Sequence, residues 1–278
     1  MKLQFDKLHG LGNDFVFLNF EIMPSELELS PALFKFLGDR KLGIGCDLTV
    51  VYDILPNNFV KAKFFNQDGS VAEICGNACR CLGLLLQKFH GISKFKIFSN
   101  YRKYNVESDS DFVKVDMGIP FFYHLLLGIE DETIDVFRMK NYLDLPECIS
   151  DACAISIGNP HLVLFTNQEL PVDLMQDLGA RLEKHQMFRN RINVSFARVL
   201  NDNQIQLTVF ERGVGLTLAC GSGACATAFA SFKFGKTASN VTVLQNGGNL
   251  DIHIDDNNSV IQKGSATYVF HGEIELCL

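Results

Sequence analysis

The sequence predicts an α+β fold that contains two copies of one β-rich unit. Short runs of β-branched and aromatic residues outnumber the helical segments along its 278 residues. In addition, three pairs of residues recur at almost the same interval along the chain. These pairs are Cys75 and Cys220, Asn66 and Glu211, and Asn13 and Asn159. The recurrence predicts two similar units, each with a Gly-Asn strand start and a Cys-Gly helix start.

The expected elements follow from the hydrophobic pattern in chain order. Strands are predicted where short apolar runs are bounded by Gly, Asn, Asp or Pro. They are residues 14–20, 47–55, 60–66, 95–100, 161–166, 193–200, 205–210 and 240–246. Helices are predicted where apolar residues recur at three- and four-residue spacing and Gly or a polar residue stands at an end. They are residues 30–39, 77–90, 172–185 and 223–235.

One Pro-marked connection gives the expected domain boundary. The segment "DMGIPFFYHLLLG", near residue 118, follows a strand-like run, and no low-complexity linker divides the chain elsewhere. We therefore expect an N-terminal half at residues 1–118 and a C-terminal half at residues 119–267. The tail, residues 268–278, can return to the first half.

Composition narrows the class of partner. The formal net charge is −7, and no block of Lys and Arg is longer than a pair, which argues against binding to nucleic acid or to an anionic membrane. No apolar stretch approaches the roughly 18 residues of a membrane-spanning helix, and the N-terminus lacks a long apolar segment. The sequence therefore predicts a cytoplasmic protein with a small polar partner.

The nine cysteines are expected to be thiols, because an odd number in a reducing compartment does not suggest a disulfide framework. Cys75, Cys79 and Cys81 form C-x3-C-x-C, which lacks the C-x2-C pairs of structural zinc sites. Neither "HGLGNDF" nor "LGIGCDL" fits a dinucleotide fingerprint. We expect neither a metal nor a cofactor. Core or packing roles are expected for Cys46, Cys79, Cys148, Cys153, Cys225 and Cys277.

Two cysteines stand where helices should begin. Cys75 is followed by Gly76 and Asn77, and Cys220 by Gly221 and Ser222. A helix N-terminus offers unpaired N–H donors and a positive dipole end, which bind carboxylates and favour a thiolate. Two such helix ends facing each other would present a sulfur on either face of a carbon next to a carboxylate. One thiolate as general base and one thiol as general acid would then invert that carbon.

The motifs that carry these residues resemble the diaminopimelate epimerase family over essentially the whole chain. They are, in family order, "KLHGLGNDFVFL", "RKLGIGCDLTVV", "FFNQDGSVAEICGNACR", "SIGNPHLVLF", "RINVSF" and "FERGVGLTLACGSGACA". The resemblance implies two similar domains, each a β-sheet or barrel wrapped around a central helix, with the site in the cleft between them. It also implies an epimerase of lysine and cell-wall precursor synthesis that needs no cofactor.

By this resemblance, Cys75 and Cys220 are the catalytic pair. The family's substrate-contact positions fall on Asn13, Asn66, Gly76, Asn77, Asn159, Asn193, Glu211, Arg212, Gly221 and Ser222. His161 and Glu211 match positions that tune the ionisation of the cysteines. Physically, the planar fork of Arg212 suits a carboxylate and Glu211 suits an ammonium group.

Several positions depart from the family pattern. Leu48 stands where Gln is common and removes an amide expected at the far end of the substrate, and Leu216 stands where Glu is common. Ala78 and Cys79 replace Gly and Ala in "CGNACR". Phe270 replaces a Tyr associated with dimer contacts, so a homodimer is left open.

Three functions remain open at this point. The first is epimerisation of LL-diaminopimelate to meso-diaminopimelate. The second is racemisation or epimerisation of another amino acid, such as histidine or a hydroxyproline, with Leu48 marking a less polar pocket. The third is a non-catalytic amino-acid binder or a thiol redox switch. Deuterium uptake from solvent at the α-carbon separates the third function from the first two.

Overall fold

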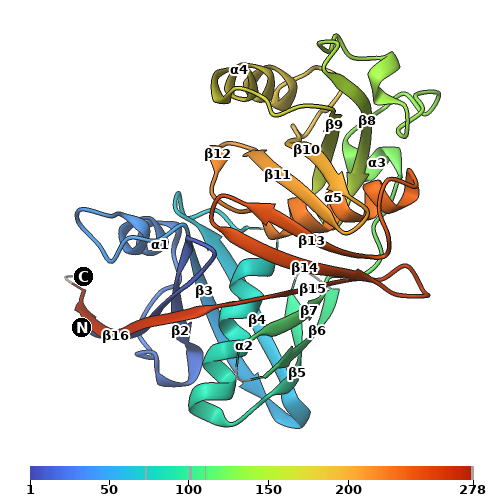
Figure 1. Ribbon diagram of the computed structural model, residues 1–278. Coiled ribbons are helices and arrows are strands. Elements are labelled where there is room, and N and C mark those ends of the chain that lie inside the picture. Colours follow the sequence, from blue (N-terminus) through green and yellow to red (C-terminus); the bar gives the residue numbers. More distant parts are fainter. Residues whose placement is uncertain (73, 100–101, 110, 277–278) are drawn as a thin grey trace. The chain divides into compact units, whose positions relative to one another are not determined.

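The chain folds into two units that are built from the same succession of strands and helices (Figure 1). The computed structural model describes residues 1–72, 74–99, 102–109 and 111–276. The first unit comprises residues 1–116 and 264–278, and the second comprises residues 117–263.

Within the described residues, the strands of the first unit follow the order β16-β1-β2-β3-β4-β5-β6-β7. They are β1 (Lys2–Gly10), β2 (Asn13–Asn19), β3 (Leu48–Leu55), β4 (Phe59–Asn66), β5 (Lys94–Ser99), β6 (Arg102–Ser108), β7 (Val113–Asp116) and β16 (Thr267–Glu275). The helices are α1 (Pro31–Gly38) and α2 (Gly76–His90), with 3-10 turns η1 (Phe20–Ile22) and η2 (Pro56–Asn58). The pairs β2–β3 and β4–β5 are parallel, and the other pairs within the unit are antiparallel.

The second unit has the strand order β15-β14-β13-β11-β10-β9-β8, and β12 pairs with β11. Its strands are β8 (Ile149–Ser156), β9 (Pro160–Thr166), β10 (Asn193–Asn201), β11 (Gln204–Glu211), β12 (Gly215–Thr217), β13 (Asn240–Gln245), β14 (Gly248–Ile254) and β15 (Val260–Gly264). Its helices are α3 (His124–Leu127), α4 (Val172–Glu183) and α5 (Gly221–Lys233), with a 3-10 turn η3 (Met139–Asn141). Here β9–β10 and β11–β13 are the parallel pairs.

The topology confirms the internal repeat. Each unit contains two antiparallel strands, a helix, two antiparallel strands, a second helix and three further strands in this order, with parallel pairs at the same two places. The 3-10 turns, α3, β12 and β16 are additional to this shared succession. Asn66 ends β4 and Glu211 ends β11, so the repeated interval marks equivalent strand ends. The α+β class predicted from the sequence is also confirmed.

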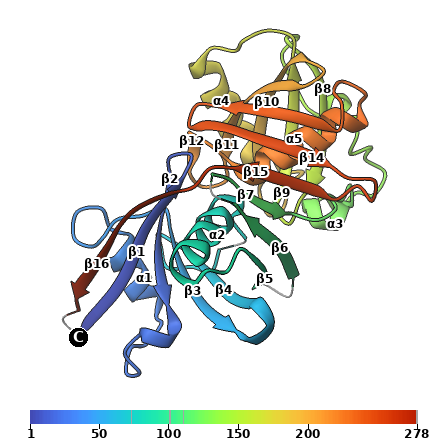
Figure 2. The ribbon, with the colours of Figure 1, turned by 60° about the horizontal axis from the view of Figure 1, so that its bottom comes forward.

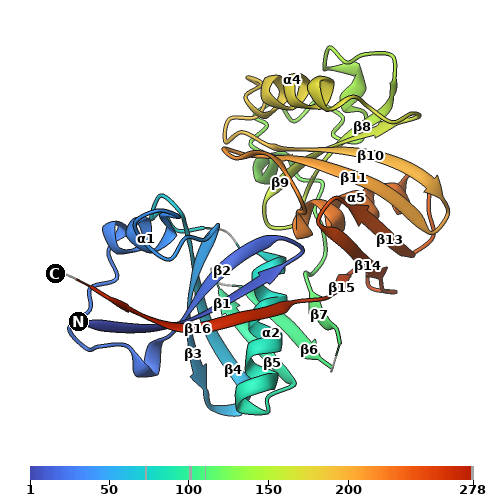
Figure 3. The same cartoon turned by 60° about the vertical axis from the view of Figure 1, so that its left-hand side comes forward.

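A buried helix lies inside each curved sheet. In the first unit α2 contacts β16, β1 and β2 from one end of the strand order and β6 and β7 from the other, so the sheet must curve around it (Figure 3). In the second unit α5 contacts β8, β9, β10, β11, β13 and β14 (Figure 2). Gly83 of α2 is required by close packing, because a Cβ there would lie 2.5 Å from Val113 Cγ1.

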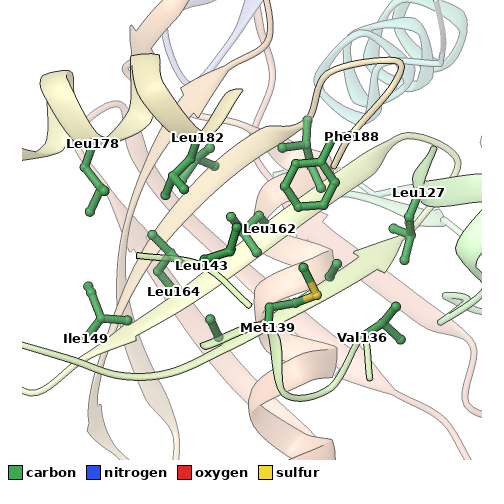
Figure 4. Close-up of a cluster of buried hydrophobic side chains, with 14 of the residues drawn as sticks. Leu127, Val136, Met139, Leu143, Ile149, Leu162, Leu164, Leu178, Leu182 and Phe188 are labelled. Carbon is green, nitrogen blue, oxygen red and sulfur yellow. The ribbon is translucent and has the colours of Figure 1, made fainter. Parts of the chain in front are cut away.

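Helix α1 of the first unit and helix α4 of the second each pack on the outer face of their sheet. Leu33, Phe34 and Leu37 of α1 join one apolar core, in which the rings of Phe34 and Phe65 stack with centroids 3.6 Å apart. Leu178 and Leu182 of α4 join the corresponding core of the second unit, which also takes in residues from the 127–143 segment (Figure 4). Each sheet is therefore held between a central and an outer helix, which fixes the strand ends that carry the candidate site.

All of the predicted strands and helices are present, with bounds shifted by a few residues. Residue 100, at the end of one predicted strand, and Cys277 lie outside the described residues. Cys46, Cys79, Cys153 and Cys225 are buried as predicted, and Cys148 is half-buried against the core of the second unit. No helix in the described part of the chain is long and apolar enough to cross a membrane.

Candidate active site

Cys75 is the N-cap residue of α2, as the sequence predicts. Its backbone is extended (φ −111°, ψ 113°), and the first helical hydrogen bond runs from Cys79 N–H to its carbonyl at 2.9 Å. Gly76 and Asn77 are the first two residues of the helix. Because the first N–H groups of a helix have no acceptor within it, this end of α2 has the form of an anion cradle.

Asn13, the first residue of β2, is hydrogen-bonded to the sulfur of Cys75. The Cys75 thiol donates to Asn13 Oδ1 at 3.7 Å, and Asn77 Nδ2 donates to the same oxygen at 3.4 Å. Strand β1 comes close to α2 here, since a Cβ on Gly10 would lie 3.3 Å from the Asn77 carbonyl oxygen. Asn13, Cys75 and Asn77 therefore form one hydrogen-bonded group.

A charged network holds the other end of the Asn13 amide. Asn13 Nδ2 donates to Asp47 Oδ2 at 2.7 Å, and Arg40 Nη2 bridges Asp47 Oδ1 at 2.8 Å and Asp14 Oδ1 at 2.6 Å. Lys7 Nζ also donates to Asp14, at 2.5 Å. Burial would raise the pKa of Asp14, but the hydrogen bonds and charges of Arg40 and Lys7 outweigh it and lower that pKa to about 2.

Arg80 fixes the side chain of Asn77 from inside the unit. It is fully buried, and its Nη2 donates to Asn77 Oδ1 at 2.8 Å while its Nε donates to the carbonyl of Ser265 at 3.3 Å. Because a guanidinium group can only donate, the Asn77 oxygen must face Arg80 and its Nδ2 must face Asn13.

Asn66 lies at the end of β4, directly opposite Leu48 in the register of β3 and β4. Its side chain donates to Ser70 Oγ at 2.9 Å, and its backbone N–H donates to the Ser70 carbonyl at 2.8 Å. Directly opposite residues on paired strands share one face of the sheet. The apolar side chain of Leu48 therefore lies beside the amide of Asn66.

Cys220 is the N-cap residue of α5 and is buried, with 5% of its surface exposed. Its sulfur accepts the Gly223 N–H at 3.4 Å and lies 3.5 Å from Ser222 Oγ. Its own N–H donates to Gln245 Oε1 at 2.8 Å, which ties the helix start to the end of β13. Gly221 and Ser222 open α5 as Gly76 and Asn77 open α2.

Three side chains meet beside Cys220. Asn159 Nδ2 donates to Ser222 Oγ at 3.1 Å, and His161 Nε2 lies 3.1 Å from both Ser222 Oγ and Asn159 Oδ1. Burial lowers the pKa of His161 to about 3, and the positive charge of Arg212 adds to this effect. The imidazole is therefore neutral near neutral pH.

The other predicted site residues of the second unit are Asn193, Glu211 and Arg212. Asn193 Nδ2 donates to the Pro160 carbonyl, and Asn193 Oδ1 accepts the Arg212 N–H, both at 2.9 Å. Arg212 Nη1 donates to the Asn190 carbonyl at 3.1 Å, and Thr217 Oγ1 donates to Glu211 Oε1 at 2.6 Å. Asn193 thus links the start of β9, next to Asn159 and His161, to the end of β11.

The side chain of Leu216 packs into the protein and is not available to a substrate. It pairs with Phe210 across β11 and β12 and packs against the apolar core of the second unit. The apolar residue is therefore explained by packing, whereas Leu48 lies beside a predicted substrate contact.

Several residues that support the site were missed by the sequence analysis. Asp47 and Arg80 lie inside quoted motifs, "GIGCDL" and "CGNACR". Asp47 is far from Asn13 in the sequence, whereas Arg80 stands three residues after Asn77 on α2, a spacing that allows side-chain contact. The burial of Arg80 is not visible in the sequence. The same holds for Glu183, a buried residue of α4 whose Oε1 accepts the Gly213 N–H at 3.1 Å.

Comparison with known proteins identifies the family. The family model described as diaminopimelate epimerase matches residues 5–122 and 153–269. Proteins named diaminopimelate epimerase from Sphingopyxis alaskensis and Rickettsia prowazekii are 38% and 40% identical over 274 residues, covering 98% of this chain and 97% of each relative.

Solved structures show the same fold at much lower identity. A PhzF-family phenazine biosynthesis protein of Bacillus anthracis has a TM-score of 0.71 at 12% identity, covering 99% of this chain and 100% of its own. A hydroxyproline epimerase of Agrobacterium vitis has a TM-score of 0.68 at 11% identity, covering 98% and 92%. From the family model and the curated relatives together, the chain belongs to the diaminopimelate epimerase family.

Proposed function

We propose that this protein interconverts LL-diaminopimelate and meso-diaminopimelate, with Cys75 and Cys220 as the acid–base pair. The observation that carries the proposal is the repeated cysteine N-cap, since each unit begins its central helix with a cysteine, a glycine and a small polar residue. Relatives at 38–40% identity carry the name diaminopimelate epimerase. The reaction belongs to lysine and peptidoglycan precursor synthesis.

In the proposed reaction, one cysteine sulfur takes the proton from the α-carbon and the other sulfur delivers a proton to the opposite face. The α C–H bond breaks, its electron pair passes into an enolate of the adjacent carboxylate, and a new C–H bond forms with inverted configuration. The N–H groups at the starts of α2 and α5, from Gly76, Asn77, Gly221 and Ser222, bind that carboxylate and stabilise the developing charge. No cofactor is needed for this chemistry.

The polar residues are proposed to orient the substrate. Arg212 pairs with a carboxylate and Glu211 with an ammonium group, while Asn13, Asn66 and Asn159 bind the substrate through their amides. Asn193 uses its oxygen and one amide hydrogen on the backbone, and its second amide hydrogen is assigned to the substrate. His161 and Glu211 tune the ionisation of the cysteines.

One observation favours a second candidate, epimerisation or racemisation of another amino acid. Leu48 places an apolar side chain beside Asn66, where an amide would suit the polar far end of diaminopimelate. A substrate with a less polar side chain would fit that surface better.

Incubation with a panel of amino acids in deuterium oxide tests the proposal. We expect α-deuteration of diaminopimelate, together with conversion of the LL form to the meso form. Deuteration of a different amino acid alone would support the second candidate. No deuteration of any substrate would contradict both and would leave an amino-acid binder or a thiol switch.

We also propose a cytoplasmic location and a small-molecule substrate in place of a nucleic acid or membrane partner. The thiol state of the eight described cysteines fits a reducing compartment. A homodimer is proposed through β16, which lies at the edge of its sheet and exposes Val269 and Phe270.

A further inference from the structure

A hairpin of the second unit holds the segment that leads into α5. Strands β13 and β14 are joined by a two-residue turn, and both strands contact α5 (Figure 2). The Gly247 N–H in this turn donates to the Leu218 carbonyl at 2.7 Å. At the end of β13, Gln245 Oε1 accepts the Cys220 N–H at 2.8 Å. Two hydrogen bonds therefore tie residues 218–220 to the tip of the hairpin.

Only one end of the Gln245 side-chain amide has a hydrogen-bond partner. A backbone N–H can only donate, so the atom that faces Cys220 is the oxygen. The Nε2 atom of Gln245 is buried and has no hydrogen-bond partner in the described part of the chain. A buried donor without a partner destabilises a protein, whereas an apolar side chain of similar length carries no such donor. The amide at this position is therefore explained by its bond to Cys220 and not by packing.

The hydrogen bond on the Cys220 N–H restrains the direction of its sulfur. Cys220 is the N-cap residue, with φ −125° and ψ 111°, so its backbone lies outside the regular turns of α5. Fixing its N–H restricts rotation about its N–Cα bond, and this rotation moves Cβ and Sγ. The sulfur is also closely packed, because a Cβ on Gly223 would lie 3.3 Å from it. A small rotation at Cys220 therefore displaces Sγ from the Gly223 N–H, from which it accepts at 3.4 Å.

The N–H groups that are proposed to bind the substrate carboxylate depend less on Gln245. Gly221 and Ser222 are the first two residues of α5, and both are buried. Their N–H groups point along the helix axis, and α5 is held by its contacts with six strands of the second unit. Loss of the bond from Gln245 should therefore displace the sulfur more than it displaces the anion cradle.

We propose that Gln245 is a positioning residue for the reaction, whose Oε1 holds the Cys220 N–H and thereby aims the sulfur at the α-carbon of the bound substrate. This inference rests on the proposed function. Gln245 acts through the backbone of Cys220, and neither contacts the substrate nor carries the transferred proton. It lies outside the sequence motifs that contain the two cysteines.

Amide hydrogen exchange tests the hydrogen bond without substrate. In protein labelled with ¹⁵N-cysteine, NMR follows the amides of Cys220 and of Cys225, which lies in the second turn of α5. Gln245→Met removes the acceptor and is expected to speed exchange at Cys220 by about tenfold or more. Exchange at Cys225 should not change, because the helix itself stays folded. Gln245→Glu keeps an acceptor at the same chain length and should retain slow exchange at Cys220.

Steady-state kinetics test the role in the reaction. Gln245→Met is expected to lower kcat by about tenfold or more, because a displaced sulfur is badly aligned with the α-carbon. KM should stay within about twofold of the wild-type value, since the helix N–H groups keep their directions. The matched control is Gln206→Met, the same substitution at a half-buried position of the neighbouring strand β11, which should leave both constants unchanged. A role in stability alone would lower the free energy of unfolding of Gln245→Met without lowering kcat.

Equal exchange at Cys220 in the wild type and in Gln245→Met would overturn the inference, and so would an unchanged kcat in the folded variant. If Gln245→Met does not fold, Gln245→Asn takes its place in both measurements, because its amide is one methylene shorter and does not reach the Cys220 N–H. A wild type that is inactive toward diaminopimelate would refute the proposed function, and amide exchange would still decide whether Gln245 holds Cys220. An active wild type with equal exchange in the variant would refute this inference alone.

Discussion

Glu183 Oε1 accepts the backbone N–H of Gly213 at 3.1 Å, which ties α4 to the turn that follows Glu211 and Arg212. Glu183 is 2% exposed and also pairs with Arg191 at 3.3 Å. A buried carboxylate thus holds the turn that carries two proposed substrate contacts.

Glu183→Gln is expected to raise KM for the substrate by up to about tenfold, because a charge-assisted hydrogen bond becomes a neutral one and the turn is held less firmly. The turnover number should change little, since no proposed acid or base is touched. Steady-state kinetics measure both constants. Asp177→Asn, at an exposed position of the same helix, is the control. A loss confined to kcat would contradict this role.

His161 is expected to make the folded protein less stable in acid. Burial holds its pKa at about 3, below the ordinary 6.5, so the unfolded chain binds a proton that the folded chain does not. The free energy of unfolding should therefore fall as the pH drops from about 6.5 toward 3, with a loss of about 2 kcal/mol between pH 7 and pH 5.

Denaturant unfolding at several pH values measures this loss. His161→Asn should reduce the difference between neutral and acidic pH, whereas His253→Gln, at an exposed position of β14, should not. An unchanged pH dependence in His161→Asn would show that another group is responsible.

Leu48→Gln is expected to increase the preference for diaminopimelate over amino acids with apolar side chains. The new amide would stand opposite Asn66 and could hydrogen-bond the polar end of the substrate. Competition between substrates, read as a ratio of kcat/KM values, measures the change. Leu216→Gln is the comparison, and it should lower stability without improving this ratio, because Leu216 packs into the core. Equal ratios for the wild type and Leu48→Gln would place residue 48 away from the substrate.

The sequence predicts the repeated frame because the signals are local. Cys-Gly followed by an apolar run marks the start of α2 and of α5, and Asn66 and Glu211 fall at equivalent strand ends. Strands such as β1 and β16 were missed, since Lys7, His9 and the largely exposed face of β16 interrupt the apolar pattern. Their pairing with each other joins the two ends of the chain, which no local pattern reports.

The support of the site could not be predicted for a similar reason. Asp47 contacts Asn13 only after β2 and β3 pair. A charged residue such as Arg80 is normally expected on the solvent-facing side of a helix, yet Arg80 is fully buried. The direction of a hydrogen bond at a sulfur depends on which atom of a partner faces it. Asp47 and Arg80 decide which atom faces the sulfur of Cys75, because they orient the amides of Asn13 and Asn77.

The central claim is that Cys75 and Cys220 act together as acid and base, and single substitution tests it most directly. Cys75→Ala and Cys220→Ala should each lower the rate of conversion of LL-diaminopimelate to meso-diaminopimelate by about 10³-fold or more, because each sulfur serves one face of the carbon. Cys148→Ala, half-buried beside the core of the second unit, should retain activity and serves as the control. Near-normal conversion by either folded Cys75→Ala or folded Cys220→Ala would contradict the two-base account.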